Sequence, residues 1–223
     1  MSNNSSNTCI IKNKSIASLN EGYKLIIRGG DDMVTTPIRR KEDIKLLKDY
    51  FMQMGEYRDY AMFVVGINTA LRISDLLRLK WKDVWNFEKK TYQLHIYVTE
   101  HKTGKYNCIA LNDSCQAALT LFGKQLKRIR PEEYIFFSGN DRYRHITRNR
   151  AYNIIKQAAL ATSIDGNISC HSLRKTFGYH AWKCGTPPAL LMNIYNHSNI
   201  EITKRYLSIE QDDKDELFQA MNL

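Results

Sequence analysis

Between positions 170 and 206 the chain carries four side chains that can act on a phosphodiester: His171, Arg174, His197 and Tyr206. His171 and Arg174 are three residues apart, so on a helix they share a face, with about 5–6 Å between their Cβ atoms. Arginine binds phosphate through a planar fork of donors, and histidine donates a hydrogen bond or moves a proton. Tyrosine can attack phosphorus and form a covalent ester. The set fits metal-free phosphoryl transfer better than a hydrolase triad.

The order and spacing of these residues resemble the tyrosine recombinases of the phage integrase family. That family has a His-x-x-Arg helix, then a Gly-His pair, then Thr-x-x-Tyr. Here the matching stretches are HSLRKTFGYH at 171–180 and NHSNIEITKRY at 196–206. The resemblance implies that Tyr206 is the nucleophile and that His171, Arg174 and His197 act on the phosphate or on the tyrosine proton. The alternative for Tyr206 is a buried core tyrosine, which the other motifs in order disfavour.

A second stretch resembles the first signature box of the same family. Thr69, Leu71 and Arg72 are followed three residues later by Asp75. By itself Arg72, at the junction of two predicted helices, would be a surface arginine. The resemblance implies instead that Arg72 binds the phosphate and that Asp75 orients its guanidinium, as an outer carboxylate orients a ligand.

A β-hairpin is predicted between the two boxes. Residues 91–99 alternate in polarity, which is typical of a strand, HKTGK at 101–105 contains a turn glycine, and a second strand is expected at 106–111. A lysine in such a turn is ordinarily solvated. The resemblance implies that Lys102 reaches the scissile phosphate as general acid, with Lys105 as the alternative.

The remaining pattern is mostly helical. A stripe of Ile44, Leu47, Phe51 and Met54 predicts one helix, and 57–70 is apolar nearly all round, which indicates a buried central helix. Ser74 is expected to cap a short helix at 75–79. Further predicted elements are helices at 113–129, 148–161 (capped by Thr147), 171–184 and from 187 on, a short strand or extended piece at 134–137 and a loop at 138–148.

The resemblance covers about residues 37–210 and implies an α+β fold, mainly α-helical, with a small antiparallel β-sheet or hairpin. Residues 1–36 are expected to form an N-terminal appendage, partly disordered because its start is rich in Ser and Asn. A strand or packed tail is one option for 23–28. Residues 37–223 are expected to be the catalytic domain, ending in a helix at 212–223 that docks on its own domain or on a neighbouring protomer. Family members usually carry a separate helical DNA-clamping domain, for which 36 residues are too few.

Two positions depart from the family pattern. Lys175 stands where many members have histidine, and Asn196 stands in place of the glycine before His197. The second change puts the course of the loop that holds His197 in question.

The net charge favours a polyanionic partner. Lys and Arg number 33 against 23 Asp and Glu, giving +10, and nucleic acid is the commonest polyanion. A basic loop leading into the helix at 148–161 either reads a DNA groove or is simply solvated. The residues expected to contact DNA are Arg142, Arg144, Arg148, Arg150, Lys105 and Lys175.

The five cysteines are irregularly spaced, which argues against a disulfide framework and for buried free thiols in a reducing compartment. A zinc site from Cys170, His171, His180 and Cys184 is disfavoured, because short-spaced ligand pairs are absent. No signal peptide and no apolar run of membrane-spanning length is recognised. We expect a cytoplasmic protein without metal or cofactor, associated with the nucleoid when bound to DNA.

The implied function is site-specific recombination of double-stranded DNA through a 3′-phosphotyrosine, by a protein that is monomeric free and tetrameric on DNA. Two alternatives stay open: a DNA-binding remnant without turnover, and relaxation of DNA in the manner of a type-IB topoisomerase. The target sequence and the balance of integration, excision and resolution are not encoded in these motifs.

Overall fold

A computed structural model describes residues 35–209, 214–215 and 218–221. The described residues belong to one compact unit, Thr35–Leu223. The expectations for residues 1–36 lie almost wholly outside the described residues. In chain order the elements are α2 (Lys41–Gln53), α3 (Tyr57–Thr69), α4 (Ile73–Leu76), α5 (Trp81–Val84), β1 (Trp85–Asn86), β2 (Thr91–Tyr92), β3 (His95–Thr99), β4 (Tyr106–Ala110), α6 (Asp113–Gly123), β5 (Phe137–Ser138), β6 (Asp141–His145), α7 (Arg148–Ala161), α8 (Cys170–Lys183), α9 (Pro188–Tyr195) and α10 (Ile200–Leu207).

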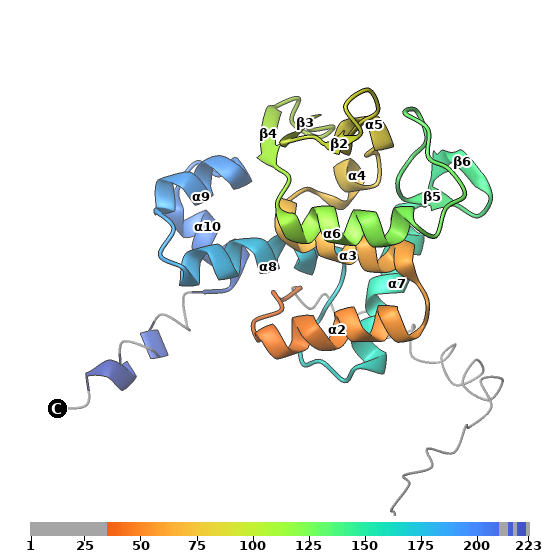
Figure 1. Ribbon diagram of the computed structural model, residues 1–223. Helices are drawn as coiled ribbons and strands as arrows, with labels where there is room; N and C mark the ends of the chain where they lie inside the picture. The colour runs from red at the N-terminus through yellow and green to blue at the C-terminus, as the bar shows by residue number, and fades with distance from the viewer. Residues whose placement is uncertain (1–34, 210–213, 216–217, 222–223) are drawn as a thin grey trace, which may run out of the picture. The chain divides into compact units, whose positions relative to one another are not determined.

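The predicted buried helix α3 is the centre of the larger core. It contacts α2, α6 and α8, and it lies between α2 and α6 in Figure 1. Most of its side chains are buried, including Met62, Phe63 and Val65 at 0% exposure. A Cβ added to Gly66 would lie 2.8 Å from Leu173 Cδ1, so the absence of a side chain there lets α8 approach α3 closely.

The described strands form three two-stranded antiparallel sheets. The predicted hairpin is present as β3–β4, which pairs in the register Ile96↔Ile109. The prediction of one strand over 91–99 is wrong, because the chain pairs as β2 with β1 before β3 begins. The expected loop 138–148 also contains β6, paired with β5. Local sequence does not reveal these pairings, because β1, β2 and β5 are only two residues long and three of the five residues of β6 are Asp or Arg.

Helix ends differ from prediction at two places. The short helix α4 starts one residue after Arg72, so Arg72 rather than Ser74 occupies the N-cap position. Helix α6 ends at Gly123, well before the predicted residue 129. Thr147 caps α7 as predicted, its side chain accepting from the Arg150 N–H.

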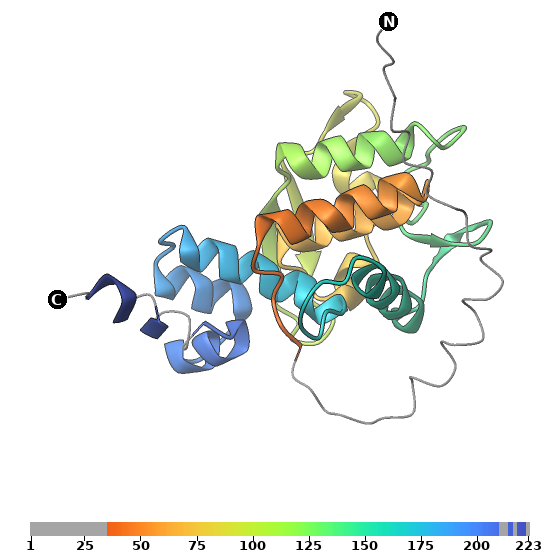
Figure 2. The same ribbon diagram turned by 90° about the horizontal axis from the view of Figure 1, so that it is seen from below.

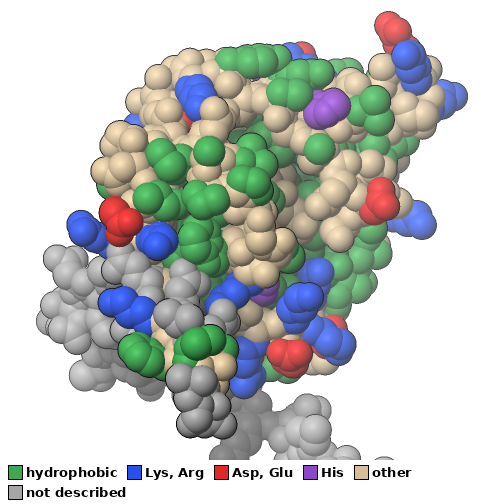
Figure 3. Space-filling view, turned by 90° about the vertical axis from the view of Figure 1, so that its left-hand side faces the viewer, with side chains coloured by type: hydrophobic (Ala, Val, Ile, Leu, Met, Phe, Trp, Pro, Cys, Tyr) green, Lys and Arg blue, Asp and Glu red, His purple; other side chains and the backbone are tan. Residues whose placement is uncertain are grey.

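A smaller apolar cluster lies beneath α9 and α10 and contains Tyr179, Leu191, Tyr195 and Leu207. Helix α8 joins the two cores, since Leu173 belongs to the larger one. Figure 2 shows α8 running from the α3 region to α9 and α10. On the side that α9 and α10 present in Figure 3, hydrophobic side chains gather near the middle, with several Lys and Arg side chains below them.

None of the helices in the described part of the chain is long and apolar enough to cross a membrane. In the tail, residues 214–215 and 218–220 are helical, and Leu217 lies outside the described residues. Phe218 and Met221 are 76% and 56% exposed, so these two side chains are not packed on their own domain.

Candidate active site

Helix α8 presents the His-x-x-Arg pair because its start is fixed by a capping box. Ser169 Oγ accepts from the His171 N–H at 3.4 Å, and the Ser169 N–H donates to Ser172 Oγ at 3.0 Å. These bonds satisfy backbone donors that the first turn of a helix leaves free. His171 and Arg174 therefore lie one turn apart, as the sequence predicts.

Tyr206 lies among the side chains predicted to act with it. Its ring centroid is 5.4 Å from that of His171 and 5.3 Å from that of His197, each edge to face. Tyr195 packs against the same ring at 5.3 Å. The Tyr206 hydroxyl is buried and makes no regular hydrogen bond with the described residues. Side chains from α8, from the end of α9 and from the turn that follows it thus meet around one phenol of α10.

Arg174 is buried beside this cluster at 4% exposure. Its Nη1 donates to the carbonyl of Ala70, the residue that ends α3 in a left-handed conformation. Its Nη2 donates to the Ile194 carbonyl at 3.4 Å, and its guanidinium lies 4.6 Å from the centroid of Tyr195. These contacts fix a cation that would otherwise be costly to bury.

Arg72 forms an ion pair with Glu100, which follows β3 and is 2% exposed. Arg174 Nη1 lies 4.0 Å from the same carboxylate. Asp75 does not pair with Arg72: its Oδ1 accepts from the His101 N–H at 3.1 Å. The prediction that Asp75 orients Arg72 is not supported, because the carboxylate next to the guanidinium comes from Glu100. Sequence reasoning missed Glu100, and only its place one residue before the lysine turn could have drawn attention to it.

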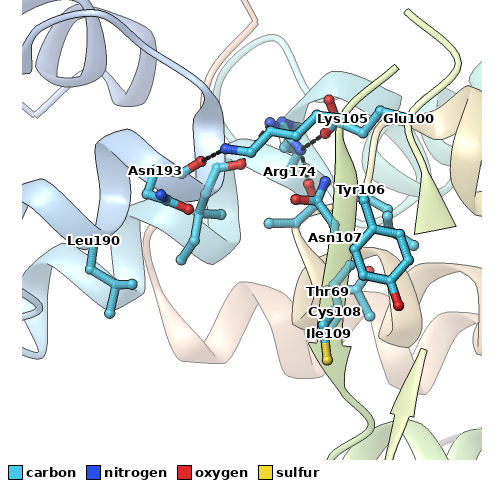
Figure 4. Close-up of a pocket in the computed structure, with 13 residues that line it drawn as sticks. Thr69, Glu100, Lys105, Tyr106, Asn107, Cys108, Ile109, Arg174, Leu190 and Asn193 are labelled. Carbon is cyan, nitrogen blue, oxygen red and sulfur yellow. Dashed lines mark hydrogen bonds and ion pairs between the residues drawn. The ribbon is translucent and has the colours of Figure 1, made fainter. Parts of the chain in front are cut away.

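The two candidate lysines differ in their contacts. Lys102 lies exposed in the turn after β3, near enough to His171 for its charge to lower that histidine's pKa. Lys105 Nζ instead donates to the Asn193 carbonyl at 3.1 Å (Figure 4). Both it and Arg174 line a cavity of about 370 Å³ between the hairpin and α9. Of the two candidate lysines, Lys105 therefore donates to a backbone carbonyl, whereas Lys102 lies exposed in the turn.

Both histidines are poised to be neutral near pH 7. Burial and the positive charges of neighbouring lysine and arginine side chains lower the pKa of His171 below 6.5, and burial with Arg174 nearby lowers that of His197. Burial raises the pKa of Tyr206 above 10, and the Arg174 guanidinium offsets part of that rise. The phenol is therefore protonated at neutral pH, and a reaction in which its oxygen attacked would need a base.

His197 is held by Thr203 of α10. Its Nδ1 lies 3.0 Å from Thr203 Oγ1, and that hydroxyl lies 3.4 Å from the Asn199 carbonyl. A hydroxyl that donates to this carbonyl accepts from Nδ1–H, whereas one that donates to Nδ1 leaves the imidazole proton on Nε2. The preceding Asn196 ends α9 in a left-handed conformation, φ 59°. Asparagine tolerates that region, so replacing the family glycine preserves the turn that leads to His197.

Lys175 is buried rather than placed on a DNA-facing surface, at 3% exposure. Its Nζ donates to the Thr35 carbonyl at 2.5 Å and lies 5.3 Å from the centroid of Tyr206. Burial lowers its pKa. The expectation that Lys175 contacts DNA is therefore not met in this structure, because the side chain is engaged inside the site.

The basic segment before and within α7 divides into two kinds of arginine. Arg142 donates to the Arg128 carbonyl at 2.7 Å and pairs with Glu133 at 3.3 Å, so it is part of the fold. Arg144, Arg148 and Arg150 are exposed. Within this segment these three present outward-facing charge of the kind that a DNA backbone contacts.

Among the described residues, no three His, Cys, Asp or Glu side chains lie close enough to hold a metal ion. The described cysteines are free, and Cys115 and Cys170 are buried. Burial raises the pKa of both thiols to about 12. The expectation that all thiols are buried is wrong for Cys108 and Cys184, which are exposed.

Comparison with known sequences gives a consistent picture. A family model described as the phage integrase family matches residues 39–212. The probable integrase/recombinase YoeC of Bacillus subtilis is 40% identical over 179 residues, which span 80% of this chain and 92% of YoeC. The tyrosine recombinase XerD of Listeria innocua is 26% identical over 68% of this chain. The chain spans 50% of the length of that XerD.

Among solved structures, the site-specific recombinase XerH bound to its palindromic difH substrate is similar at a TM-score of 0.60. The match covers 80% of this chain and 50% of that one, at 16% identity. At that identity the likeness establishes the fold, which is the mainly α-helical α+β fold expected from the sequence.

Proposed function

Because the chain belongs to the phage integrase family and is a tyrosine-type site-specific recombinase, we propose that Tyr206 cuts DNA by forming a 3′-phosphotyrosine. One observation carries this proposal: His171, His197 and Arg174 surround the buried phenol of Tyr206. Residues 37–223 act as the catalytic domain.

In the cleavage step the Tyr206 oxygen attacks phosphorus, and the bond from phosphorus to the 5′-oxygen breaks. His171, neutral at pH 7 because its pKa is lowered, accepts the tyrosine proton. Lys102 gives a proton to the leaving 5′-oxygen. The products are a 3′-phosphotyrosine and a free 5′-hydroxyl, so atoms and charge balance.

The non-bridging oxygens gain negative charge as the tyrosine attacks. Arg72 and Arg174 stabilise that charge through paired N–H donors. His197 donates to a phosphate oxygen from Nε2 once it is protonated, since a nearby anion raises the pKa of an imidazole. Asp75 acts indirectly, by holding the backbone of the lysine turn.

Rejoining is the same chemistry in reverse. A 5′-hydroxyl from another strand attacks the phosphotyrosine, so the energy of the phosphodiester is kept and ATP is not consumed. One tyrosine cuts one strand, and a full exchange of two duplexes therefore uses four protomers on DNA. The exposed Arg144, Arg148 and Arg150 contact the duplex backbone. The exposed Phe218 and Met221 suit docking of the tail on a neighbouring protomer.

A nicked suicide substrate built from the ends of the host element tests the proposal, with wild type and Tyr206→Phe compared on a denaturing gel. The expected result is a covalent protein–DNA band in wild type that Tyr206→Phe lacks. Absence of the band on DNA that the protein demonstrably binds would instead favour a binding remnant. Relaxation of supercoiled DNA that lacks paired sites would favour the topoisomerase-like activity.

A further inference from the structure

We propose that Glu100 is a positioning residue that couples the guanidinium of Arg72 to the turn that carries Lys102. The proposal rests on the function proposed for this site. Glu100 Oε2 pairs with Arg72 and also accepts from Thr103 Oγ1 at 2.6 Å. One carboxylate oxygen thus contacts the phosphate-binding cation and the lysine turn together.

The carboxylate of Glu100 is more deeply buried than the guanidinium of Arg72. The Glu100 side chain is 1% exposed, whereas that of Arg72 is 22% exposed, so Arg72 keeps an open face for a phosphate. Arg174 Nη1 lies 4.0 Å from the other carboxylate oxygen of Glu100, Oε1 (Figure 4). Burial alone would raise the pKa of Glu100, but the Thr103 hydroxyl and the two arginines outweigh it and lower the pKa. Glu100 is therefore ionised at neutral pH and holds both cations without occupying the open face.

The backbone of Glu100 also closes the lysine turn. Its N–H donates to the Lys105 carbonyl at 2.8 Å, and its carbonyl accepts from the Gly104 N–H at 2.8 Å. Gly104 supplies the left-handed conformation, φ +68°, that the turn requires. The Thr103 hydroxyl adds a hydrogen bond from a side chain of this turn to the Glu100 carboxylate.

This arrangement gives Lys102 a defined place relative to the arginines although its own ammonium is exposed. A proton donor must stand within hydrogen-bond reach of the leaving oxygen while the phosphate is bound. Because Glu100 contacts both Arg72 and the turn, the position of Lys102 is fixed relative to a phosphate that Arg72 binds. Loss of the hydrogen bond from Thr103 to Glu100 would therefore impair proton donation more than phosphate binding.

The test compares two suicide substrates, one with the natural 5′-oxygen and one with sulfur at that bridging position. A thiolate leaves without protonation far more readily, because a thiol has a pKa near 8.5. Lys102→Ala is the reference variant. It is expected to cleave the oxygen substrate slowly and to cleave the sulfur substrate at close to the wild-type rate. Thr103→Val is expected to follow it, about tenfold slower on oxygen and within about twofold of wild type on sulfur.

Matched variants distinguish a positioning role from a general loss of folding. Thr103 is exposed, so its replacement leaves the core intact, and Thr103→Ser, which keeps the hydroxyl, is expected to restore the oxygen-substrate rate. Glu100→Gln removes the charge that faces both arginines and is expected to slow both substrates, the oxygen one more. Equal slowing of both substrates by Thr103→Val, or none by either variant, would overturn the proposal.

A second measurement is independent of DNA cleavage. Hydrogen exchange of the Gly104 and His101 amides, both bonded in this structure, is expected to rise in Glu100→Gln and Thr103→Val but not in Thr103→Ser. Unchanged exchange in both variants would contradict the coupling. If wild type forms no covalent complex, the proposed function fails, while this measurement still decides whether Glu100 holds the turn.

Discussion

The imidazole of His171 stands edge-on to the ring of Tyr206, with centroids 5.4 Å apart and planes at 86°. This contact joins the start of α8 to the last full turn of α10. It places a base beside a phenol whose pKa is raised mainly by burial. The pH dependence of cleavage should therefore depend on the histidine rather than on the tyrosine.

Single-turnover cleavage should lose rate as pH falls through the pKa of His171, which lies below 6.5 because burial and nearby cations disfavour the charged form. Below that pKa the imidazole is protonated and cannot accept the tyrosine proton. A rate profile between pH 5 and 8 on the nicked substrate measures the midpoint. His171→Gln should be slower and lose this acidic limb; a limb that persists in the variant would assign it to another group.

Gly178→Ala should destabilise the protein by about 1–3 kcal/mol, as overpacking does. An added Cβ would lie 2.5 Å from both Leu207 Cδ2 of α10 and Tyr195 Oη of α9, forcing α8 away from both helices. Cleavage should fall as well, since Tyr206 precedes Leu207. Urea unfolding and covalent-complex yield are the measurements.

Gly123→Ala is the matched control for this prediction. Gly123 is also helical, but its added Cβ would meet only Trp81 at 3.6 Å, and alanine favours a helix by about 0.5–1 kcal/mol. The control should therefore be neutral or more stable. Equal effects of the two substitutions would contradict the close packing of α8 against α10.

Asn196→Gly should be tolerated, whereas Asn196→Val should cost about 1–2 kcal/mol. The residue adopts φ 59°, which glycine accepts freely and a β-branched side chain does not. Because Asn196 leads directly to His197, the valine variant should also reduce cleavage. Thermal unfolding and single-turnover rates on both variants measure this, and a fully active, stable Asn196→Val would show that the turn does not constrain His197.

Removing Arg144, Arg148 or Arg150 should weaken DNA binding on every sequence. The slope of log affinity against log salt should fall by about 0.9 for each phosphate that the protein no longer neutralises. Arg142→Ala should chiefly reduce stability, since the carboxylate of Glu133, 4% exposed, loses its ion pair and keeps only the hydrogen bond from the Arg130 N–H. Binding titrations from low to moderate salt measure the slopes. An unchanged slope in all three exposed variants would place the duplex elsewhere.

Motif order and helical periodicity were enough to predict much of this site. His171 and Arg174 follow from spacing on one helix, and Thr147 follows from capping preferences, because these depend on residues close together in the chain. The central helix α3 follows from its uniform apolarity. The short strand or extended piece predicted at 134–137 overlaps β5 at Phe137, whereas β6 was missed because its pairing depends on a partner strand, which local charge patterns do not reveal.

The sequence alone determined the family and which residue types are expected to carry the chemistry. Only the tertiary structure decided which charges face one another. Glu100 rather than Asp75 pairs with Arg72, and Lys175 lies inside beneath Tyr206. Such pairings join residues 28 or 31 positions apart through packing of separate elements. No periodicity encodes them, because burial and Coulomb interaction depend on distance in space rather than along the chain.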